Sequence, residues 1–267
     1  MVMTSVDESV RTVSRSDRTV ISYSVVGPAH GPTWVYVHGW GCRRTDFDPV
    51  AAFLPEGDRV VSVDLAGHGD STSARAAWTM AEFARDVAAV LVAESVERCV
   101  VVGHSLGGAV ALELARLLPD TVTEVIGLDS FHYLGLYPAI EDAAARGLLQ
   151  TFEDDFSSGV RSLVVMGSVP DTDPGFAEAI FAKASRLVPA VGIGTLAEML
   201  RWDMDEALAA VPHPVATLAV RGLLDPAAPE RYGDRIDFVV HELGSHHFLL
   251  ERPEETAALL LATRTTA

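Results

Sequence analysis

Short apolar segments alternate with amphipathic segments along the first half of this chain, and that order constrains the fold more than any other feature. The predicted strands are residues 34–38, 59–64, 99–102 and 122–128, and the predicted helices are residues 79–94 and 106–118. Strands with continuous apolar character are typical of parallel sheets that are covered on both faces. The alternation therefore predicts an α/β fold with a mostly parallel, doubly wound sheet.

The alternation stops after Asp129. Residues 131–211 contain several segments of helical pattern separated by Pro and Gly, and within them residues 163–166 suit either a strand or a helix. The strand pattern resumes at 214–220 and 237–241, and a last helix is expected at 253–263. We therefore expect a core formed by residues 1–130 and 212–267, with residues 131–211 inserted as a helical cap. Near the start of the chain, segments 10–15 and 19–26 predict a β-hairpin.

Composition narrows the classes of partner. The formal net charge is −17, with only 20 Lys and Arg residues, which argues against nucleic acid and against anionic membranes. No apolar run is long enough for a transmembrane helix, and residues 1–18 do not read as a secretory signal. We expect a cytoplasmic protein that binds a small molecule; the sequence does not distinguish a monomer from a homodimer. Two cysteines, Cys42 and Cys99, establish no disulfide framework.

Ser105 is the first candidate for chemistry. It lies in Gly103-His104-Ser105-Leu106-Gly107, between a predicted strand and a predicted helix. A serine on a sharp strand-to-helix turn is exposed above the sheet edge, and the flanking glycines relieve steric crowding. We therefore predict that Ser105 is a nucleophile.

A serine hydroxyl needs a general base, and the base needs a carboxylate to orient it. His246 and His247 both follow the last predicted strand, so at least one of them is expected to be the base. Asp225 is the preferred acid because it follows the strand at 214–220. Asp129, which follows the strand at 122–128, is the rival.

The oxyanion of such a reaction needs two backbone N–H groups. Leu106, the residue after the nucleophile, is expected to supply one. Trp40, in the loop His38-Gly39-Trp40-Gly41, is expected to supply the other.

The substrate pocket is expected to include a small set of neighbouring side chains: Trp40, Cys42, Phe131, His132 and Tyr133. We expect no metal, because His241, His246 and His247 have no supporting Cys or acidic ligand pattern. We also expect no nucleotide cofactor, because Gly-x-Gly-x-x-Gly is absent.

Taken together, these segments resemble the α/β-hydrolase superfamily over nearly the whole chain. The carriers of the resemblance are His38-Gly39-Trp40-Gly41, Asp64-Leu65-Ala66-Gly67-His68-Gly69-Asp70-Ser71, Gly103-His104-Ser105-Leu106-Gly107-Gly108, Gly222 to Asp225, and His247-Phe248 followed by Glu251-Arg252-Pro253-Glu254. The match of His247-Phe248 and the following Glu251-Arg252-Pro253-Glu254 to the family's histidine loop selects His247 as base. The chain departs from the family at His246, where glycine is usual. It implies an α/β-hydrolase fold with a helical cap, and small esterases and lactonases are the most similar members, among them the biotin-pathway methyl esterase. Ser105 argues against the haloalkane dehalogenases and epoxide hydrolases, whose nucleophile is Asp.

The predicted function is hydrolysis of carboxylic esters or lactones through an acyl-enzyme, with Ser105, His247 and Asp225 as the triad. The acyl group is expected to be short to medium and neutral, because the cap segments mix apolar residues with few basic ones. The alternatives are a ligand-sensing receptor with little turnover, or a C–C bond hydrolase, thioester hydrolase or perhydrolase that uses the same triad.

Overall fold

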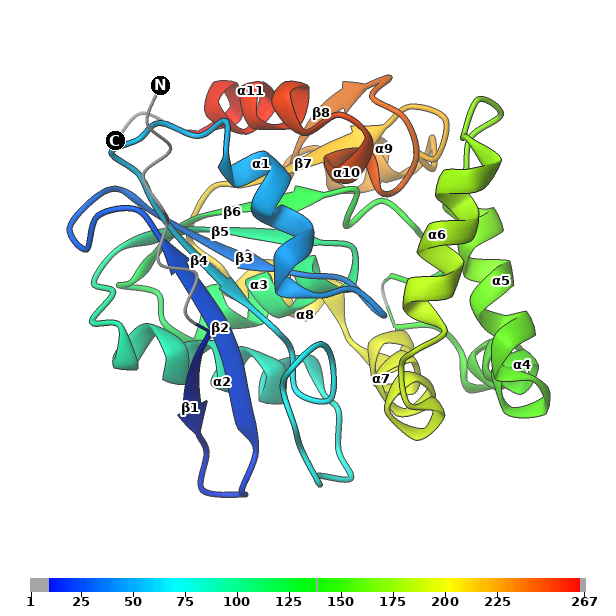
Figure 1. Ribbon diagram of the computed structural model, residues 1–267. Coiled ribbons are helices and arrows are strands. Elements are labelled where there is room, and N and C mark those ends of the chain that lie inside the picture. The colour runs from blue at the N-terminus through cyan, green and yellow to red at the C-terminus, as the bar shows by residue number, and fades with distance from the viewer. Residues whose placement is uncertain (1–9, 138, 265–267) are drawn as a thin grey trace.

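A computed structural model describes residues 10–137 and 139–264 of the chain. Its centre is an eight-stranded sheet with the order β1-β2-β4-β3-β5-β6-β7-β8 (Figure 1). The strands are β1 (Arg11–Ser14), β2 (Val20–Val26), β3 (Thr33–Val37), β4 (Arg59–Val63), β5 (Cys99–His104), β6 (Val122–Leu128), β7 (Val215–Val220) and β8 (Asp237–His241). The hairpin β1–β2 is antiparallel and β2 pairs antiparallel with β4, whereas every pair from β4 to β8 is parallel. The predicted mostly parallel α/β fold is confirmed.

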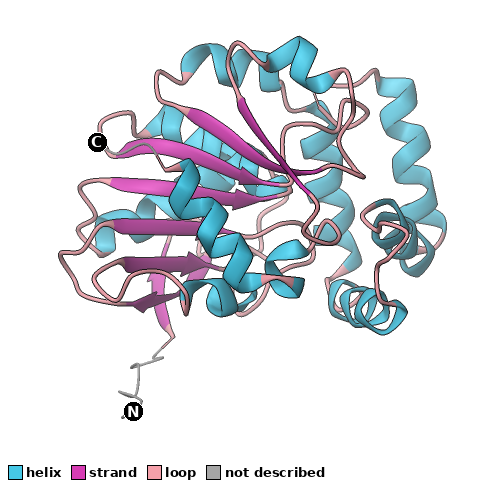
Figure 2. Ribbon diagram, turned by 90° about the horizontal axis from the view of Figure 1, so that it is seen from above, coloured by secondary structure: helices cyan, strands magenta, loops and turns pink. Residues whose placement is uncertain are grey.

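Helices cover both faces of the sheet (Figure 2). Those of the core are α1 (Asp48–Ala51), α2 (Met80–Ala93), α3 (Leu106–Leu117), α8 (Met204–Ala210), α9 (Ala228–Tyr232), α10 (Phe248–Glu251) and α11 (Pro253–Thr263), and a 3-10 helix (Arg44–Phe47) precedes α1. On β3, Val35 and Val37 pack in the cluster that contains α2 and α3, whereas Trp34 and Tyr36 pack in the cluster that contains α1 and α11. Successive strand residues point to opposite faces, so a sheet covered on both sides needs apolar residues at every position.

A capping side chain sets the start of α2. The Thr79 side chain accepts a hydrogen bond from the N–H of Glu82 at 3.1 Å, which satisfies a donor that the first turn leaves unpaired. The helix then buries an apolar stripe that includes Phe83 and Val87. Full burial of side chains of this kind contributes about 1.5–3 kcal/mol each.

The segment between β6 and β7 is helical throughout its regular part. Its helices are α4 (Asp142–Asp154), α5 (Phe156–Met166), α6 (Pro174–Ala184), α7 (Pro189–Arg201) and α8. Residues 163–166 end α5, so the helical interpretation of that stretch is the one the structure supports. Helices α4 to α7 gather beyond one end of the sheet (Figures 1 and 2), whereas α8 packs against α3. The division of the chain into a core and a separate cap stays a prediction.

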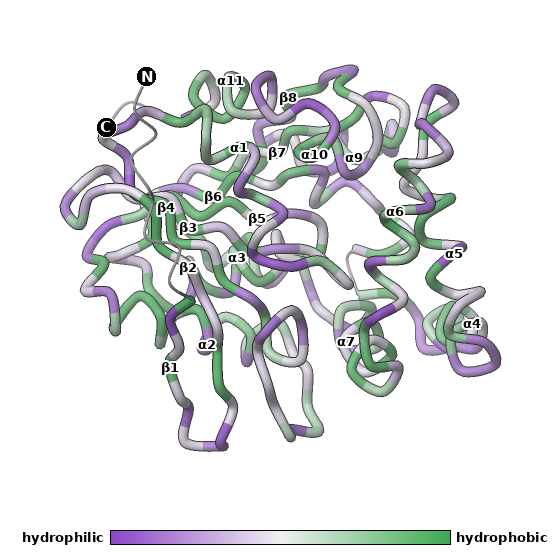
Figure 3. Tube along the Cα trace, in the orientation of Figure 1, coloured by the Kyte–Doolittle hydropathy of each residue, from purple (hydrophilic) through white to green (hydrophobic). Residues whose placement is uncertain are grey.

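The hydropathy of the chain follows these layers, with hydrophobic residues along the central strands (Figure 3). Among residues 10–137 and 139–264, no single helix is long and apolar enough to cross a bilayer. Helices α6 and α7 reach the length and apolar character of a membrane span only when they are taken together, and the chain bends by 101° between them.

Candidate active site

Ser105 lies on the sharp turn between β5 and α3. Its φ of 53° and ψ of −122° fall outside the regions that most residues with a side chain adopt, so the backbone is strained there. A Cβ on Gly103 would lie 2.3 Å from the carbonyl oxygen of Gly107, and one on Gly107 would lie 2.1 Å from that of Val37. Close backbone packing therefore requires both glycines that flank Ser105.

Asp129 follows β6, the strand next to the one that ends at the Ser105 turn. Its side chain is fully buried. Four groups donate hydrogen bonds to its carboxylate: Nδ1 of His246 at 2.6 Å, Nε2 of His132 at 2.9 Å, the N–H of Val220 at 2.9 Å, and the Tyr133 hydroxyl. Burial alone would raise the pKa of Asp129, but the hydrogen bonds and charges of His132 and His246 outweigh it and hold that pKa well below its usual range. Asp129 is therefore a buried ionised carboxylate bonded to a histidine of the cavity wall.

Three contacts hold His246. Its Nδ1 faces Asp129, and its backbone N–H donates to the carbonyl oxygen of Gly167 at 2.8 Å. Its own carbonyl oxygen accepts from Nε2 of His104 at 2.9 Å. Because Nδ1 is engaged with a carboxylate, Nε2 is the ring nitrogen left to exchange a proton. Gly167 follows α5, so the helical segment between β6 and β7 helps to position this ring.

The structure does not bring Asp225 and His247 together, which corrects the pairing expected from the sequence. The Asp225 carboxylate accepts from the N–H of Ala227 at 3.0 Å, a local turn that Asp often caps. Within the described part of the chain, no hydrogen bond joins it to a histidine. The His247 ring instead lies 5.1 Å from the ring of His104 and 5.2 Å from that of His246, measured between centroids.

Strand order gives the physical reason for this difference. Asp129 follows β6, which pairs directly with β5, whereas Asp225 follows β7, one strand farther away. The sequence also contains a signal for Asp129 as the acid. His132 and Tyr133, three and four residues later, are donors suited to a buried carboxylate, and both bond to it.

The expected oxyanion donors lie on either side of the Ser105 turn. Among the residues that the structure describes, the N–H groups of Trp40 and Leu106 make no hydrogen bond, while the N–H of Ser105 donates to Leu128 at 3.0 Å. A Cβ on Gly39 would lie 3.0 Å from the Cβ of Ser105, so the loop passes directly beside the serine. The Trp40 ring serves another purpose, because its Nε1 donates to the carbonyl oxygen of Gly192 on α7 at 2.9 Å.

A partly open cavity lies over Ser105, which forms part of its wall. The apolar part of its wall comes mainly from the segment between β6 and β7: Leu136, Tyr137, Val160, Leu163, Val164, Met166, Ile180, Leu196 and Met199. Both His246 and His247 also line it, together with His104.

The expected pocket residues divide into two groups. Trp40, Cys42 and Tyr133 line the cavity. Phe131 and His132 do not line it: the Phe131 ring packs against Gly108 and Gly127, and His132 bonds to Asp129 behind the cavity wall.

Lys183, which sequence reasoning did not single out, also lines the cavity. Its Nζ lies 2.7 Å from Oδ2 of Asp46, so its charge is paired. Helical spacing on α6 alone gives no signal that this side chain turns toward Ser105.

Comparisons with known proteins agree with this architecture. Residues 34–259 match the model of the alpha/beta hydrolase family. The chain is 32% identical to a pimeloyl-[acyl-carrier protein] methyl ester esterase of Neisseria meningitidis, over 84% of this chain and 90% of that one. An uncharacterised protein of Mycobacterium tuberculosis is 38% identical over 36% of this chain, and the match spans 28% of that relative's length.

Among solved structures, Est816, described as an N-acyl homoserine lactone degrading enzyme, superposes with a TM-score of 0.80. It is 23% identical in sequence, over 95% of this chain and all of that one. At this identity the likeness concerns the fold. With a family model that matches most of its length, and with the strand order and Ser105 turn described above, the chain belongs to the alpha/beta hydrolase family.

Proposed function

We propose that this protein is a serine hydrolase that cleaves carboxylic esters or lactones, with Ser105 as nucleophile, His246 as general base and Asp129 as acid. One observation carries the choice of residues: the 2.6 Å contact between Asp129 and His246 in the wall of the cavity that contains Ser105. The relative named as a pimeloyl-[acyl-carrier protein] methyl ester esterase supports the class of reaction.

In the acylation step, Ser105 Oγ attacks the carbonyl carbon and His246 Nε2 takes the hydroxyl proton. The imidazolium that forms is stabilised by the ionised Asp129, which also keeps the Nδ1–H tautomer in place. The carbonyl oxygen becomes an oxyanion and accepts hydrogen bonds from the N–H groups of Trp40 and Leu106. Removal of one such donor typically costs about 10²–10³ in rate.

In the steps that follow, His246 returns its proton to the leaving alcohol, and the alcohol departs. Water then attacks the acyl-enzyme with His246 again as base, which restores Ser105 and releases the acid. The positive end of the α3 dipole points at the reacting centre and favours both oxyanions.

The cavity supports a short to medium neutral acyl group as substrate. Its wall is largely aliphatic, and the charge of Lys183 is already paired with Asp46. An apolar wall stabilises an acyl chain by about 25 cal/mol per Å² removed from water.

A comparison of the wild type with Ser105→Ala tests this proposal. We expect turnover of p-nitrophenyl acetate and butyrate, and of a lactone panel, to vanish in Ser105→Ala. A fluorophosphonate should label the wild type on Ser105 and leave the variant unlabelled. Ser162→Ala, an exposed serine on α5, is the matched control and should behave as the wild type. Full activity in Ser105→Ala would overturn the mechanism, and tight ligand binding without turnover across the panel would favour the receptor.

A further inference from the structure

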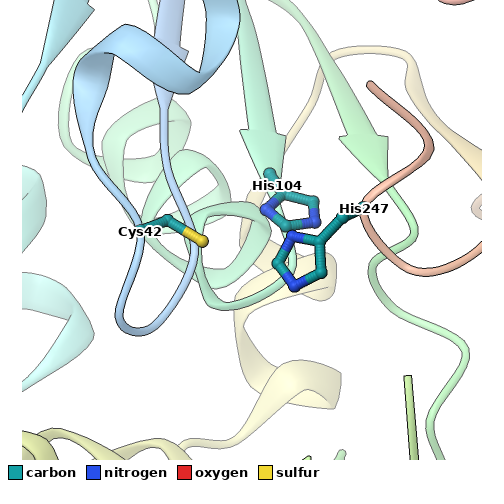
Figure 4. Close-up of side chains that lie close together, drawn as sticks. All are labelled: Cys42, His104 and His247. Carbon is teal, nitrogen blue, oxygen red and sulfur yellow. The ribbon is translucent and has the colours of Figure 1, made fainter. Parts of the chain in front are cut away.

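Three side chains that the proposed reaction does not use meet at one side of the cavity. Cys42 lies in the loop after β3, His104 ends β5, and His247 directly precedes α10. They point toward one another (Figure 4), and the Cys42 Sγ and one ring nitrogen of each histidine all lie within 4.8 Å of one another. Cys42 is 5% exposed and His104 is 1% exposed. His247 is half-buried, so distant parts of the sequence place a thiol and two imidazoles together at the edge of the cavity.

Two atoms of this cluster lack the partners that burial normally demands. Among the described residues, Nδ1 of His104 and Nδ1 of His247 are buried and make no hydrogen bond. Buried polar side-chain atoms are paired in the large majority of cases, so two unpaired nitrogens beside a buried thiol need an explanation.

We propose that Cys42, His104 and His247 form a binding site for Zn²⁺ or a cation of similar softness. One thiolate and two neutral imidazoles form a donor set that suits Zn²⁺, which binds sulfur at about 2.3 Å and imidazole nitrogen at about 2.0–2.1 Å. Ligand atoms within 4.8 Å of one another can close on such an ion through small side-chain rotations. All three side chains line the cavity, so a fourth ligand position on the ion would be open to water or a ligand.

The surroundings of His104 already select the ring tautomer that metal binding requires. Its Nε2 lies 2.9 Å from the carbonyl oxygen of His246, so Nε2 carries the proton and Nδ1 presents its lone pair. A metal-binding histidine almost always donates its other N–H in this way.

The thiol is protonated before it binds. A free cysteine thiol has a pKa of about 8.5, so it carries its proton at pH 7. Coordination therefore exchanges one proton for one metal–sulfur bond, and the displaced proton goes to solvent. Affinity should increase with pH as this proton is released more easily.

A cation at this site would sit in the wall of the cavity that holds Ser105, and its open position would take water or substrate oxygen away from the oxyanion donors. Reversible inhibition of the hydrolase by Zn²⁺ follows. This consequence rests on the proposed function, whereas metal binding itself does not.

The experiment uses the full chain freed of metal with a chelator. Co²⁺, added as a spectroscopic probe, should give one saturating equivalent with tetrahedral absorption and a thiolate-to-cobalt band, and Zn²⁺ should displace it. Cys42→Ala should lose the thiolate band, and His247→Gln should bind Zn²⁺ at least about 10–100-fold more weakly, the range for loss of supporting metal-site groups. Cys99→Ala, the other buried free cysteine, is the matched control and should keep both signals. Mg²⁺, a hard cation, should not compete.

Zn²⁺ should also inhibit p-nitrophenyl butyrate turnover in the wild type and in Cys99→Ala, and much less in His247→Gln. Absence of saturable Co²⁺ binding would overturn the site, as would an unchanged Zn²⁺ affinity in folded Cys42→Ala and His247→Gln. If no ester is hydrolysed at all, the Co²⁺ spectra still decide the metal site, so its failure is distinguishable from failure of the proposed function.

Discussion

Replacement of Asp129 by Asn is the sharpest test of the proposed triad. Asn has nearly the same shape but no charge, so the cavity created is small. Its amide can still accept the hydrogen bond of the Val220 N–H, at 2.9 Å in the wild type. Toward His246, however, it offers an N–H₂ donor where the wild type offers a carboxylate oxygen. The imidazole must then present Nδ1 as acceptor, which moves its proton to Nε2 and leaves Ser105 without a base.

The expected loss is large because one substitution removes both the tautomer and the charge that stabilises the imidazolium. A triad Asp-to-Asn change of this kind lowers kcat about 10⁴-fold, equivalent to about 5.4 kcal/mol at 1.36 kcal/mol per tenfold. The unfolding free energy should change by less, since the lost charge-assisted hydrogen bonds, about 1.5–3 kcal/mol each, are offset by removal of the cost of burying a carboxylate.

The assay is kcat/KM with p-nitrophenyl butyrate at pH 7.5, with thermal unfolding measured on the same samples. Asp225→Asn is the matched control and should keep activity within a few-fold, because its carboxylate caps a local turn. A 10³-fold loss in Asp225→Asn, with Asp129→Asn near the wild type, would refute the reasoning and restore the pairing that the sequence favoured.

Three further outcomes follow from the same geometry. His246→Gln should lower kcat about as much as Asp129→Asn, whereas His247→Gln should keep most activity in metal-free buffer; the opposite order would contradict the choice of base. Gly107→Ala should destabilise the fold in chemical denaturation, because its Cβ would lie 2.1 Å from the carbonyl oxygen of Val37, and an unchanged midpoint would count against that close approach. The depressed pKa of Asp129 adds stability that is fully present above its unfolded pKa of about 3.9 and is lost as pH falls below that value. Unfolding free energies between pH 3 and 6 should therefore fall less steeply in Asp129→Asn, and parallel curves would show that Asp129 does not contribute.

Much of the fold was predictable from local patterns. The strands at 99–104 and 122–128 are short apolar runs, and the Thr79 side chain marks the start of α2. The strand-turn-helix at Ser105 needs Gly103 and Gly107 because the backbone packs closely there, and the five-residue pattern Gly-x-Ser-x-Gly contains both. Such features depend on neighbours within a few residues, so they can be predicted from the sequence.

The partners of the serine were not predictable in the same way. Asp129 and Asp225 both follow strands of one sheet, and His246 and His247 are adjacent, so spacing could not choose within either pair. The choice depends on strand order, which places β6 beside β5, and on the contact of Gly167 with the backbone of His246. The lining of the pocket could not be predicted from spacing either. Lys183 on α6 and Cys42 after β3 are 141 positions apart in the chain, and yet both line one cavity.

By itself the sequence determined the α/β architecture, the strand-turn-helix that carries the proposed nucleophile and the loop that carries the expected oxyanion donors. These depend on hydrophobic periodicity and on backbone sterics, which act over short stretches of chain. Only the tertiary structure decided that Asp129 bonds to His246, that Asp225 caps a turn, and that Cys42, His104 and His247 converge. Contacts of this second kind form between residues brought together by the packing of the sheet and its helices, and no local pattern encodes which of two similar side chains will meet.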